Sequence, residues 1–254
     1  MRSETGKVGA LEYAFAGAKG FVRSNNEDNC IGLCAHGVFA VADGMGGGEA
    51  GEIASGLIVD TLRKGFGALG SDLKETFESR RELVQACLEE ANDEIFEYSV
   101  RNEFNVMGST FVGLVSDPEK PRRMAVCYVG DSRAYYFRDG DLVQVTEDHT
   151  VYNDYIRAGR EAELASLSPK AQQALSRAVG VGRIVEEDWI ELPLHRGDIV
   201  LLCTDGLTKM IDDKTIERIL GSTSSLAGAC SALLSFALSS GGRDNVTVLL
   251  VRAE

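Results

Sequence analysis

The segment Val38-Phe-Ala-Val-Ala-Asp-Gly-Met-Gly-Gly-Gly-Glu-Ala-Gly-Glu52 joins a predicted strand to a predicted helix. Its apolar run Val38–Ala42 has the composition of a buried strand. Asp43 follows directly, and the glycines after it allow the backbone to turn and to approach a ligand closely. Beyond Gly51 the apolar residues recur at helical spacing. The segment therefore predicts a carboxylate between a buried strand and a helix N-terminus, which suits a cation and an anionic substrate.

Four aspartates share this local pattern. Asp43 and Asp205 end apolar runs and precede a glycine, Asp131 follows such a run, and Asp244 lies just before one. A single Asp-Gly is typical of a simple turn at a strand exit. Four acids in the same position are better explained by strand ends that converge. Because clustered carboxylates repel one another, they predict cations between them.

The residue types define the cation and suggest the substrate. Oxygen ligands without nearby His or Cys favour a hard ion, Mg²⁺ or Mn²⁺. Two such ions bridged by one carboxylate would activate a water molecule and hold a phosphoryl oxygen. Arg23 lies five residues before Asp28, with Glu27 adjacent, in a polar loop. An arginine fork can bind phosphate through two hydrogen bonds, although in isolation a surface arginine is the simpler interpretation.

Composition and charge exclude several classes of protein. The net charge of −13 repels phosphate backbones, so we expect no nucleic-acid partner. Residues 1–7 lack the apolar run of a signal peptide, and the longest uncharged stretch, 219–242, indicates an amphipathic or buried helix rather than a membrane segment. The six cysteines are scattered, which predicts reduced, buried thiols. We therefore expect a monomeric, cytoplasmic, single-domain protein.

The expected order of elements is strands, two helices, several strands, helices and a final strand. The first strand is predicted at Leu11–Ala16, and the two helices at about residues 49–66 and 73–103. Residues 149–181 are predicted to be helical but weakly apolar, which indicates a surface subdomain. Helices do not alternate with every strand, so the pattern favours an α+β fold of mostly antiparallel sheets flanked by helices.

Six motifs between residues 23 and 247 resemble, in order, those of the bacterial type 2C (PPM) metal-dependent protein Ser/Thr phosphatases. They are Arg23-Ser-Asn-Asn-Glu-Asp28, Val41-Ala-Asp-Gly-Met-Gly-Gly47, Gly108-Ser-Thr110, Val129-Gly-Asp-Ser-Arg133, Thr204-Asp-Gly-Leu207 and Arg243-Asp-Asn-Val-Thr247. The resemblance implies an αββα sandwich of two antiparallel sheets with helices outside. It also implies a single catalytic domain over residues 1–254, with a mobile flap at about 149–181.

The resemblance assigns ligands to two core Mn²⁺ or Mg²⁺ ions. Asp43 is implied to bridge both ions, the Gly44 carbonyl to bind one of them, and Asp205 and Asp244 to complete the site. The pair Glu27 and Asp28 is implied to hold metal-bound waters.

The resemblance also places Arg23 on the substrate phosphate and Asp131, together with Asp205, at a weaker third ion. The implied reaction is direct attack of a metal-bridging water, in which Arg23, Asp43 and Asp205 take part and no phosphoenzyme forms. Some relatives carry a histidine where this chain has Met45 or Gly48. We therefore hypothesise that a water on the third ion protonates the leaving oxygen, and we interpret His149 as structural.

Three functions remain open from the sequence. The first is a phosphatase acting on phosphorylated proteins and opposing a cognate Ser/Thr kinase in signalling. The second is a catalytically weak sensor or scaffold of the same fold, which the intact set Arg23, Asp43, Asp205 and Asp244 disfavours. The third is a metal-dependent hydrolase of small phosphate esters.

Overall fold

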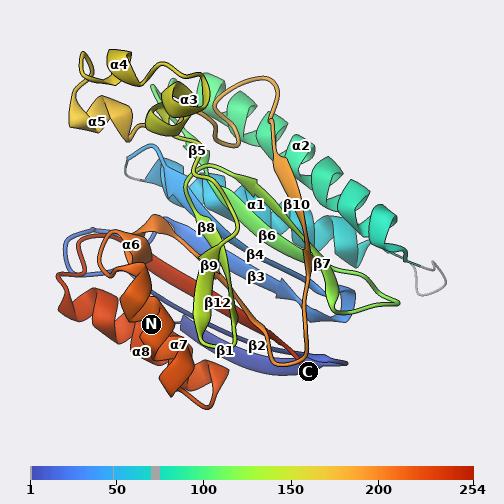
Figure 1. Cartoon of the computed structure of the whole chain (residues 1–254). Coiled ribbons are helices and arrows are strands. Elements are labelled where there is room, and N and C mark those ends of the chain that lie inside the picture. Colours follow the sequence, from blue (N-terminus) through green and yellow to red (C-terminus); the bar gives the residue numbers. More distant parts are fainter. Residues whose placement is uncertain (1, 48, 70–74) are drawn as a thin grey trace.

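Two antiparallel sheets face each other and carry helices on both outer sides (Figure 1). The computed structural model describes residues 2–47, 49–69 and 75–254. The first sheet has the order β1 (Arg2–Val8), β2 (Leu11–Ala18), β12 (Val246–Ala253), β11 (Ile199–Cys203), β8 (Arg133–Arg138) and β9 (Asp141–Gln144). The second has the order β10 (Asp188–Pro193), β7 (Arg123–Val129), β6 (Phe111–Ser116), β4 (Val38–Met45) and β3 (Asp28–Leu33), with β5 (Gly108–Ser109) paired to β4. The predicted αββα sandwich is confirmed.

Each outer face has its own helices. The second sheet is covered by α1 (Glu49–Gly67) and α2 (Phe77–Arg101). The first sheet is covered by α6 (Asp205–Thr208), α7 (Asp213–Ser222) and α8 (Leu226–Ser239). The short helix η1 (Cys34–His36) joins β3 to β4. Among the described residues, no helix is both long and apolar enough to cross a membrane.

The central strands are continuously apolar because both of their faces are buried. In β4, Phe39 and Val41 pack between the sheets, whereas Val38, Ala40 and Ala42 pack against α1 and α2. This double burial explains why the sequence shows unbroken apolar runs rather than the alternation of a sheet with one solvated face.

Two strands differ from the predicted pattern. The polar strand β1 was not predicted, because it is an edge strand that pairs with β2 alone and needs little apolar surface. Strand β4 extends beyond Asp43, because Gly44 and Met45 pair with Ser109 and Gly108 of β5. Asp43 therefore lies within a strand and not in the glycine turn that follows it.

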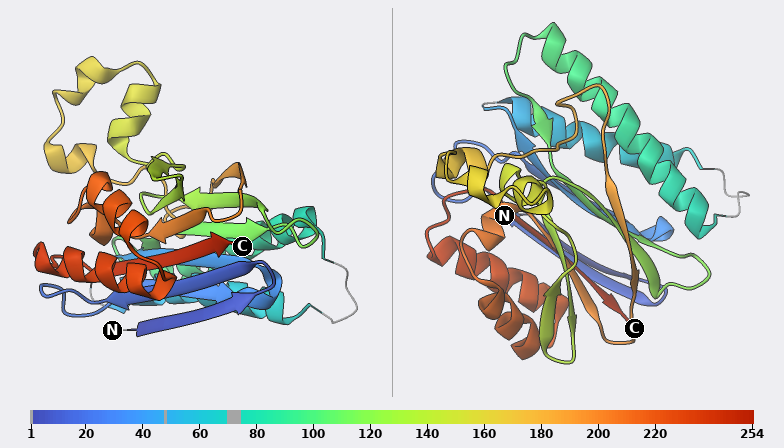
Figure 2. Two further views of the ribbon diagram at one scale, coloured as in Figure 1. Left: turned by 60° about the horizontal axis from the view of Figure 1, so that its bottom comes forward. Right: turned by 45° about the horizontal axis from the view of Figure 1, so that its top comes forward.

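The helical regions also begin and end at different residues from those predicted. Helix α2 begins at Phe77, where Thr76 and Ser79 form a reciprocal capping box; residues 73 and 74 of the predicted helix lie outside the described residues. The predicted surface subdomain contains three short helices, α3 (Val151–Arg157), α4 (Glu161–Leu164) and α5 (Pro169–Gln172). These helices extend away from the sheets at one end of the sandwich (Figure 2).

Candidate active site

A cavity of about 260 Å³ is lined by residues from several strand ends and by Gln173 and Leu175, which follow α5. Seven of the eight residues singled out from the sequence line it, namely Arg23, Glu27, Asp43, Gly44, Asp131, Asp205 and Asp244. The eighth, Asp28, is buried next to them and pairs in register with Asp43 between β3 and β4. The structure therefore brings all eight together, while their individual chemical roles stay predictions.

Asp43 is fixed by the neighbouring Gly108-Ser-Thr110 motif. Its backbone N–H donates to Thr110 Oγ1 at 3.0 Å, and its carbonyl accepts from the Thr110 N–H at 2.9 Å and from Ser109 Oγ at 3.0 Å. Thr110 Oγ1 also shares a 2.7 Å hydrogen bond with Ser132 Oγ, next to Asp131. These bonds position the Asp43 carboxylate and couple it to the turn that carries Asp131.

Gly44 lies where three segments meet too closely for a side chain. Its N–H donates to the Glu27 carbonyl at 3.1 Å, and that carbonyl also accepts from Ser55 Oγ at 2.6 Å. A Cβ at Gly44 would lie 1.9 Å from the Gly51 carbonyl oxygen. The end of β4 can therefore contact the start of α1 only because residue 44 is a glycine.

Two carboxylate oxygens are buried without a hydrogen-bond partner among the described residues, Asp28 Oδ1 and Asp205 Oδ1. The other Asp28 oxygen accepts from Thr204 Oγ1 at 2.9 Å, and Thr204 Oγ1 in turn accepts from the Thr247 N–H at 3.0 Å. An unpaired buried acceptor is costly, so such atoms indicate a cation or an ordered water as the missing partner.

The electrostatics of the cluster favour protons or cations. Burial, and then the charges of Asp28 and Asp205, raise the pKa of Asp43 well above its usual range. Burial and the Asp205 charge raise the pKa of Asp131 to about 7, and burial also raises the pKa of Asp28 to about 7. Carboxyl groups with these pKa values bind cations in exchange for protons.

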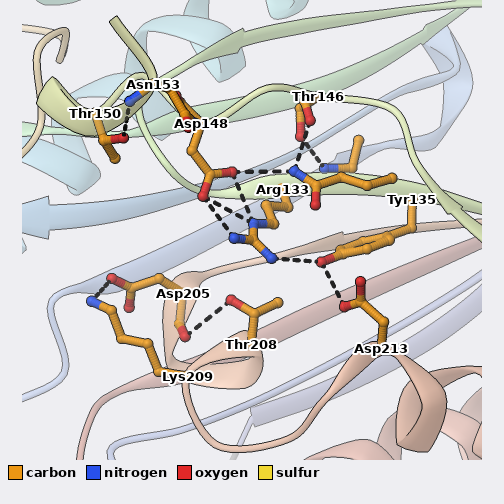
Figure 3. A network of polar contacts seen from close by, with 12 residues as sticks. Arg133, Tyr135, Thr146, Asp148, Thr150, Asn153, Asp205, Thr208, Lys209 and Asp213 are labelled. Carbon is orange, nitrogen blue, oxygen red and sulfur yellow. Dashed lines mark hydrogen bonds and ion pairs between the residues drawn. The ribbon is translucent and has the colours of Figure 1, made fainter. Parts of the chain in front are cut away.

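Two basic side chains partly neutralise the cluster. Arg23 Nη2 contacts Asp244 Oδ2 at 2.8 Å, and Lys209 Nζ forms an ion pair with Asp205 Oδ2 (Figure 3). Within the described part of the chain, no three His, Cys, Asp or Glu side chains converge closely enough to enclose a metal ion. The Asp205 and Asp244 carboxylates are instead turned toward these two bases.

Sequence reasoning missed several residues that build the site. Asn245 accepts from the Glu27 N–H at 2.8 Å and donates to the Lys19 and Asn25 carbonyls, which anchors the loop that carries Arg23. Asn245 belongs to the Arg243-Asp-Asn-Val-Thr247 motif, but nothing in the sequence indicated its contact with Glu27. Lys209 follows Asp205 by four residues, a spacing that brings the two side chains together only because Asp205 begins α6 and does not end a strand as expected.

His149 has a structural position, as interpreted from the sequence. It is fully buried, stacks on Tyr128, accepts from the Gly130 N–H through Nδ1 at 3.1 Å, and lies 3.1 Å from Asp188 Oδ2 through Nε2. It thereby fixes the turn before Asp131. The other position considered for a histidine, Gly48, lies outside the described residues, and Met45 lines the cavity.

A second polar network supports the far side of the same turn. Arg133 binds both oxygens of Asp148, at 2.8 Å from Nε and 2.7 Å from Nη2, and donates to the Tyr135 hydroxyl at 3.0 Å (Figure 3). Tyr135 in turn donates to Asp213 at 3.1 Å. This network ties β8 to the root of the α3–α5 segment and to the start of α7.

Comparisons with known proteins identify the family of this chain. The family model described as Protein phosphatase 2C matches residues 23–238. The chain belongs to this family. Among type 2C relatives, the Serine/threonine phosphatase stp of Listeria monocytogenes serotype 4b is 34% identical, over 96% of each chain.

Solved structures of the type 2C fold lead to the same conclusion. PppA of Pseudomonas aeruginosa, described as a key regulatory component of T6SS, superimposes with a TM-score of 0.83 at 32% identity, over 100% of both chains. The catalytic domain of the serine threonine protein phosphatase PstP, in complex with 2 manganese ions, gives a TM-score of 0.76 at 30% identity, over 95% of this chain and 97% of that one.

Proposed function

We propose that this protein is a metal-dependent protein Ser/Thr phosphatase that hydrolyses phosphoserine and phosphothreonine in other proteins. The observation that carries the proposal is the gathering of five aspartates and Arg23 around one open cavity in a type 2C chain. Its relatives are named Ser/Thr phosphatases, which supports the same substrate class. The open cavity suits a phosphorylated side chain presented on a protein surface.

The residues present fit two Mn²⁺ or Mg²⁺ ions. Asp43, Asp205, Asp244 and the Gly44 carbonyl offer the oxygen donors that these ions prefer, and the unpartnered Asp205 Oδ1 needs such a partner. Burial and the charges of the neighbouring carboxylates raise the pKa values of Asp43 and Asp131, and a cation bound between these groups would replace the proton. When bound, the ions lower the pKa of water and stabilise phosphoryl charge. The proposal also draws on the two manganese ions of the related PstP domain.

Other residues would bind and orient the substrate. The Arg23 side chain is 45% exposed, so its guanidinium can move away from Asp244 and bind a phosphate through two hydrogen bonds. Glu27 and Asp28 would hold metal-bound waters, and Asp131 would lie where the resemblance places a weaker third ion. Two residues near α5, Gln173 and Leu175, also line the cavity, which supports a flap at about 149–181 that contacts the substrate.

Further parts of the proposal concern the setting of the protein. We propose that residues 1–254 form one catalytic domain that acts as a monomer in the cytoplasm. A cognate Ser/Thr kinase in a signalling pathway would supply the phosphorylated substrates, because a phosphatase of this class needs a reaction to reverse. The strongly acidic surface supports protein rather than nucleic-acid partners.

The test is hydrolysis of a phosphothreonine peptide with Mn²⁺, with and without EDTA. We expect turnover that EDTA abolishes and that Asp205→Ala lowers by roughly 10²–10³-fold, as for the loss of one preorganised electrostatic group. Asp60→Ala is the matched control, because Asp60 is an exposed α1 aspartate that pairs with Arg63 and is not among the residues that line the cavity. Folded protein that binds Mn²⁺ but turns over no phosphopeptide would favour the sensor or scaffold alternative. Faster turnover of small phosphate esters than of the phosphopeptide would favour a metal-dependent hydrolase of small phosphate esters.

A further inference from the structure

Lys209 is a basic side chain of the cavity to which the family resemblance gives no role. It follows directly after α6 and lies one helical turn beyond Asp205, with which its Nζ forms an ion pair (Figure 3). Both side chains line the cavity, as does Asp131. A positive charge is thus built into the acidic end of the site by the chain itself.

Lys209 acts on both carboxylates that are expected to share a third metal ion. It contacts Asp205 directly, and it is near enough to Asp131 for its charge to stabilise the ionised form of that carboxylate. Asp131 and Asp244 in turn stabilise the Lys209 ammonium. The Lys209 ammonium therefore supplies positive charge next to Asp131 and Asp205, as a metal ion bound between them would.

The two oxygens of Asp205 are in different surroundings. Oδ2 is paired with Lys209, whereas Oδ1 is buried and has no hydrogen-bond partner among the described residues. Asp205 can therefore offer Oδ1 to a core ion while Oδ2 stays with Lys209. The lysine competes with a third ion and leaves the core ligand free.

We propose that Lys209 is a tethered cation that takes the place of the third metal ion between Asp131 and Asp205, so that this phosphatase binds two ions and excludes the third. The inference rests on the proposed metal-dependent function. If the third ion is excluded, no water bound to it can protonate the leaving oxygen, as was hypothesised from the sequence. The Lys209 ammonium offers hydrogen-bond donors at that position instead.

A simpler alternative is a surface ion pair that opens when metal binds. The Lys209 side chain is 57% exposed, and exposed lysine pairs contribute little to stability. The Asp205 side chain, however, is 13% exposed, so its pairing is screened less than that of a surface carboxylate. A tethered group also acts at an effective concentration on the order of millimolar, which competes well with a weakly bound ion.

The test counts bound Mn²⁺ by isothermal titration calorimetry and by electron paramagnetic resonance, without substrate. We expect two ions in the wild type and a third in Lys209→Met, bound at least about tenfold more tightly than any third ion in the wild type. The Lys209→Arg variant keeps the positive charge and should bind two Mn²⁺ ions. Lys214→Met is the matched control, because Lys214 is an exposed lysine at the start of α7, and it should also bind two.

The outcomes separate this inference from the proposed function. A third ion of equal affinity in wild type and Lys209→Met would overturn it, because the lysine would then exclude nothing. Two ions in both proteins would also overturn it, because Asp131 and Asp205 would then form no third site. Folded protein that binds no Mn²⁺ in any variant would overturn the proposed function together with the inference.

Discussion

Arg23 has two possible partners, and they belong to different states of the site. Its guanidinium contacts Asp244 at 2.8 Å and Glu27 at 3.5 Å. A metal ion on Asp244 would displace the guanidinium, which then becomes available to a substrate phosphate. The arginine that pairs with Asp244 would therefore bind the substrate once a metal ion takes its place on Asp244.

Arg23→Ala should lower kcat/KM for a phosphopeptide by about 10–100-fold, because charge-assisted hydrogen bonds contribute about 1.5–3 kcal/mol. Mn²⁺ affinity should stay the same or rise, because Asp244 loses a competing cation. Steady-state kinetics and calorimetry measure the two effects. Arg63→Ala, at an exposed arginine of α1, is the control. A parallel loss of Mn²⁺ binding and activity would contradict the phosphate-binding role.

Gly44→Ala should destabilise the metal-free protein by about 3 kcal/mol, because the new Cβ would overlap the Gly51 carbonyl and the backbone must move. Urea unfolding measures the change. Gly67→Ala is the matched control, since a Cβ at this α1 residue meets no atom within 4 Å and should be neutral or slightly stabilising. Equal stability of both variants would show that β4 and α1 adjust easily.

Single residues differ in how well the sequence predicts them. The convergence of Asp43, Asp131, Asp205 and Asp244 was predictable, because strand ends in one sandwich meet at one edge. The Lys209 contact was not, because Asp205 was expected to end a strand and instead begins α6, and that helix turns residue 209 back toward it.

Among the elements, the turn between β7 and β8 depends on a side chain from outside it. His149 precedes α3, yet its ring nitrogen Nδ1 accepts a hydrogen bond from the Gly130 N–H. The backbone N–H of His149 donates to the Gly130 carbonyl at 2.9 Å. Burial lowers the pKa of His149, so the ring stays neutral and can act as an acceptor. The root of the α3–α5 segment and the Asp131 turn therefore form one unit.

His149→Phe should destabilise the protein by about 1–3 kcal/mol, because it retains the aromatic stack on Tyr128 but leaves the Gly130 N–H without its acceptor. It should also lower activity, since the adjacent Asp131 is released. Denaturant unfolding and phosphopeptide kinetics measure these effects, and His195→Phe, at an exposed histidine, is the control. An unchanged free energy of unfolding would show that the hydrogen bond is dispensable.

The elements were predicted best where apolar pattern and burial coincide. The strand from Val38 begins at the predicted residue because both of its faces are buried. The edge strand β1 and the division of residues 149–181 into three short helices left no comparable pattern. Their positions depend on pairing with β2 and on contacts such as the bridge from Thr150 to Leu175.

At the scale of the molecule, the sandwich concentrates negative charge where its strands end. The sequence predicted two layers of sheet between helices, and the sheet order adds that β4, β7, β11 and β12 come from distant parts of the chain. The carboxylates therefore come together only when the chain folds. Without metal, this convergence opposes folding, and cations or protons relieve it.

The cost of bringing the carboxylates together can be measured from the pH dependence of the stability of the metal-free protein. Folding raises the pKa of Asp131 from 3.8 to about 7, so the folded state holds the proton more tightly than the unfolded state does. At pH 4 the buried Asp131 carboxyl therefore adds almost no free-energy cost to folding. The cost grows as the pH rises toward 7, because the unfolded state loses this proton more readily than the folded state. Asp131→Asn removes that penalty. The melting temperature of Asp131→Asn in EDTA should exceed that of the wild type by roughly 5 °C at pH 8 and by little at pH 4.

Mn²⁺ should reverse this dependence, because metal binds the deprotonated carboxylates and is favoured as pH rises. The stabilisation of the wild type by Mn²⁺ should thus increase from pH 5 to pH 8 in differential scanning calorimetry. Asp141→Asn, at an exposed aspartate of β9, should follow the wild type throughout. An Asp131→Asn protein whose melting temperature is no higher at pH 8 would mean that Lys209 already neutralises Asp131. The folding penalty would then lie with Asp28 and Asp43, whose pKa values are raised by the same burial.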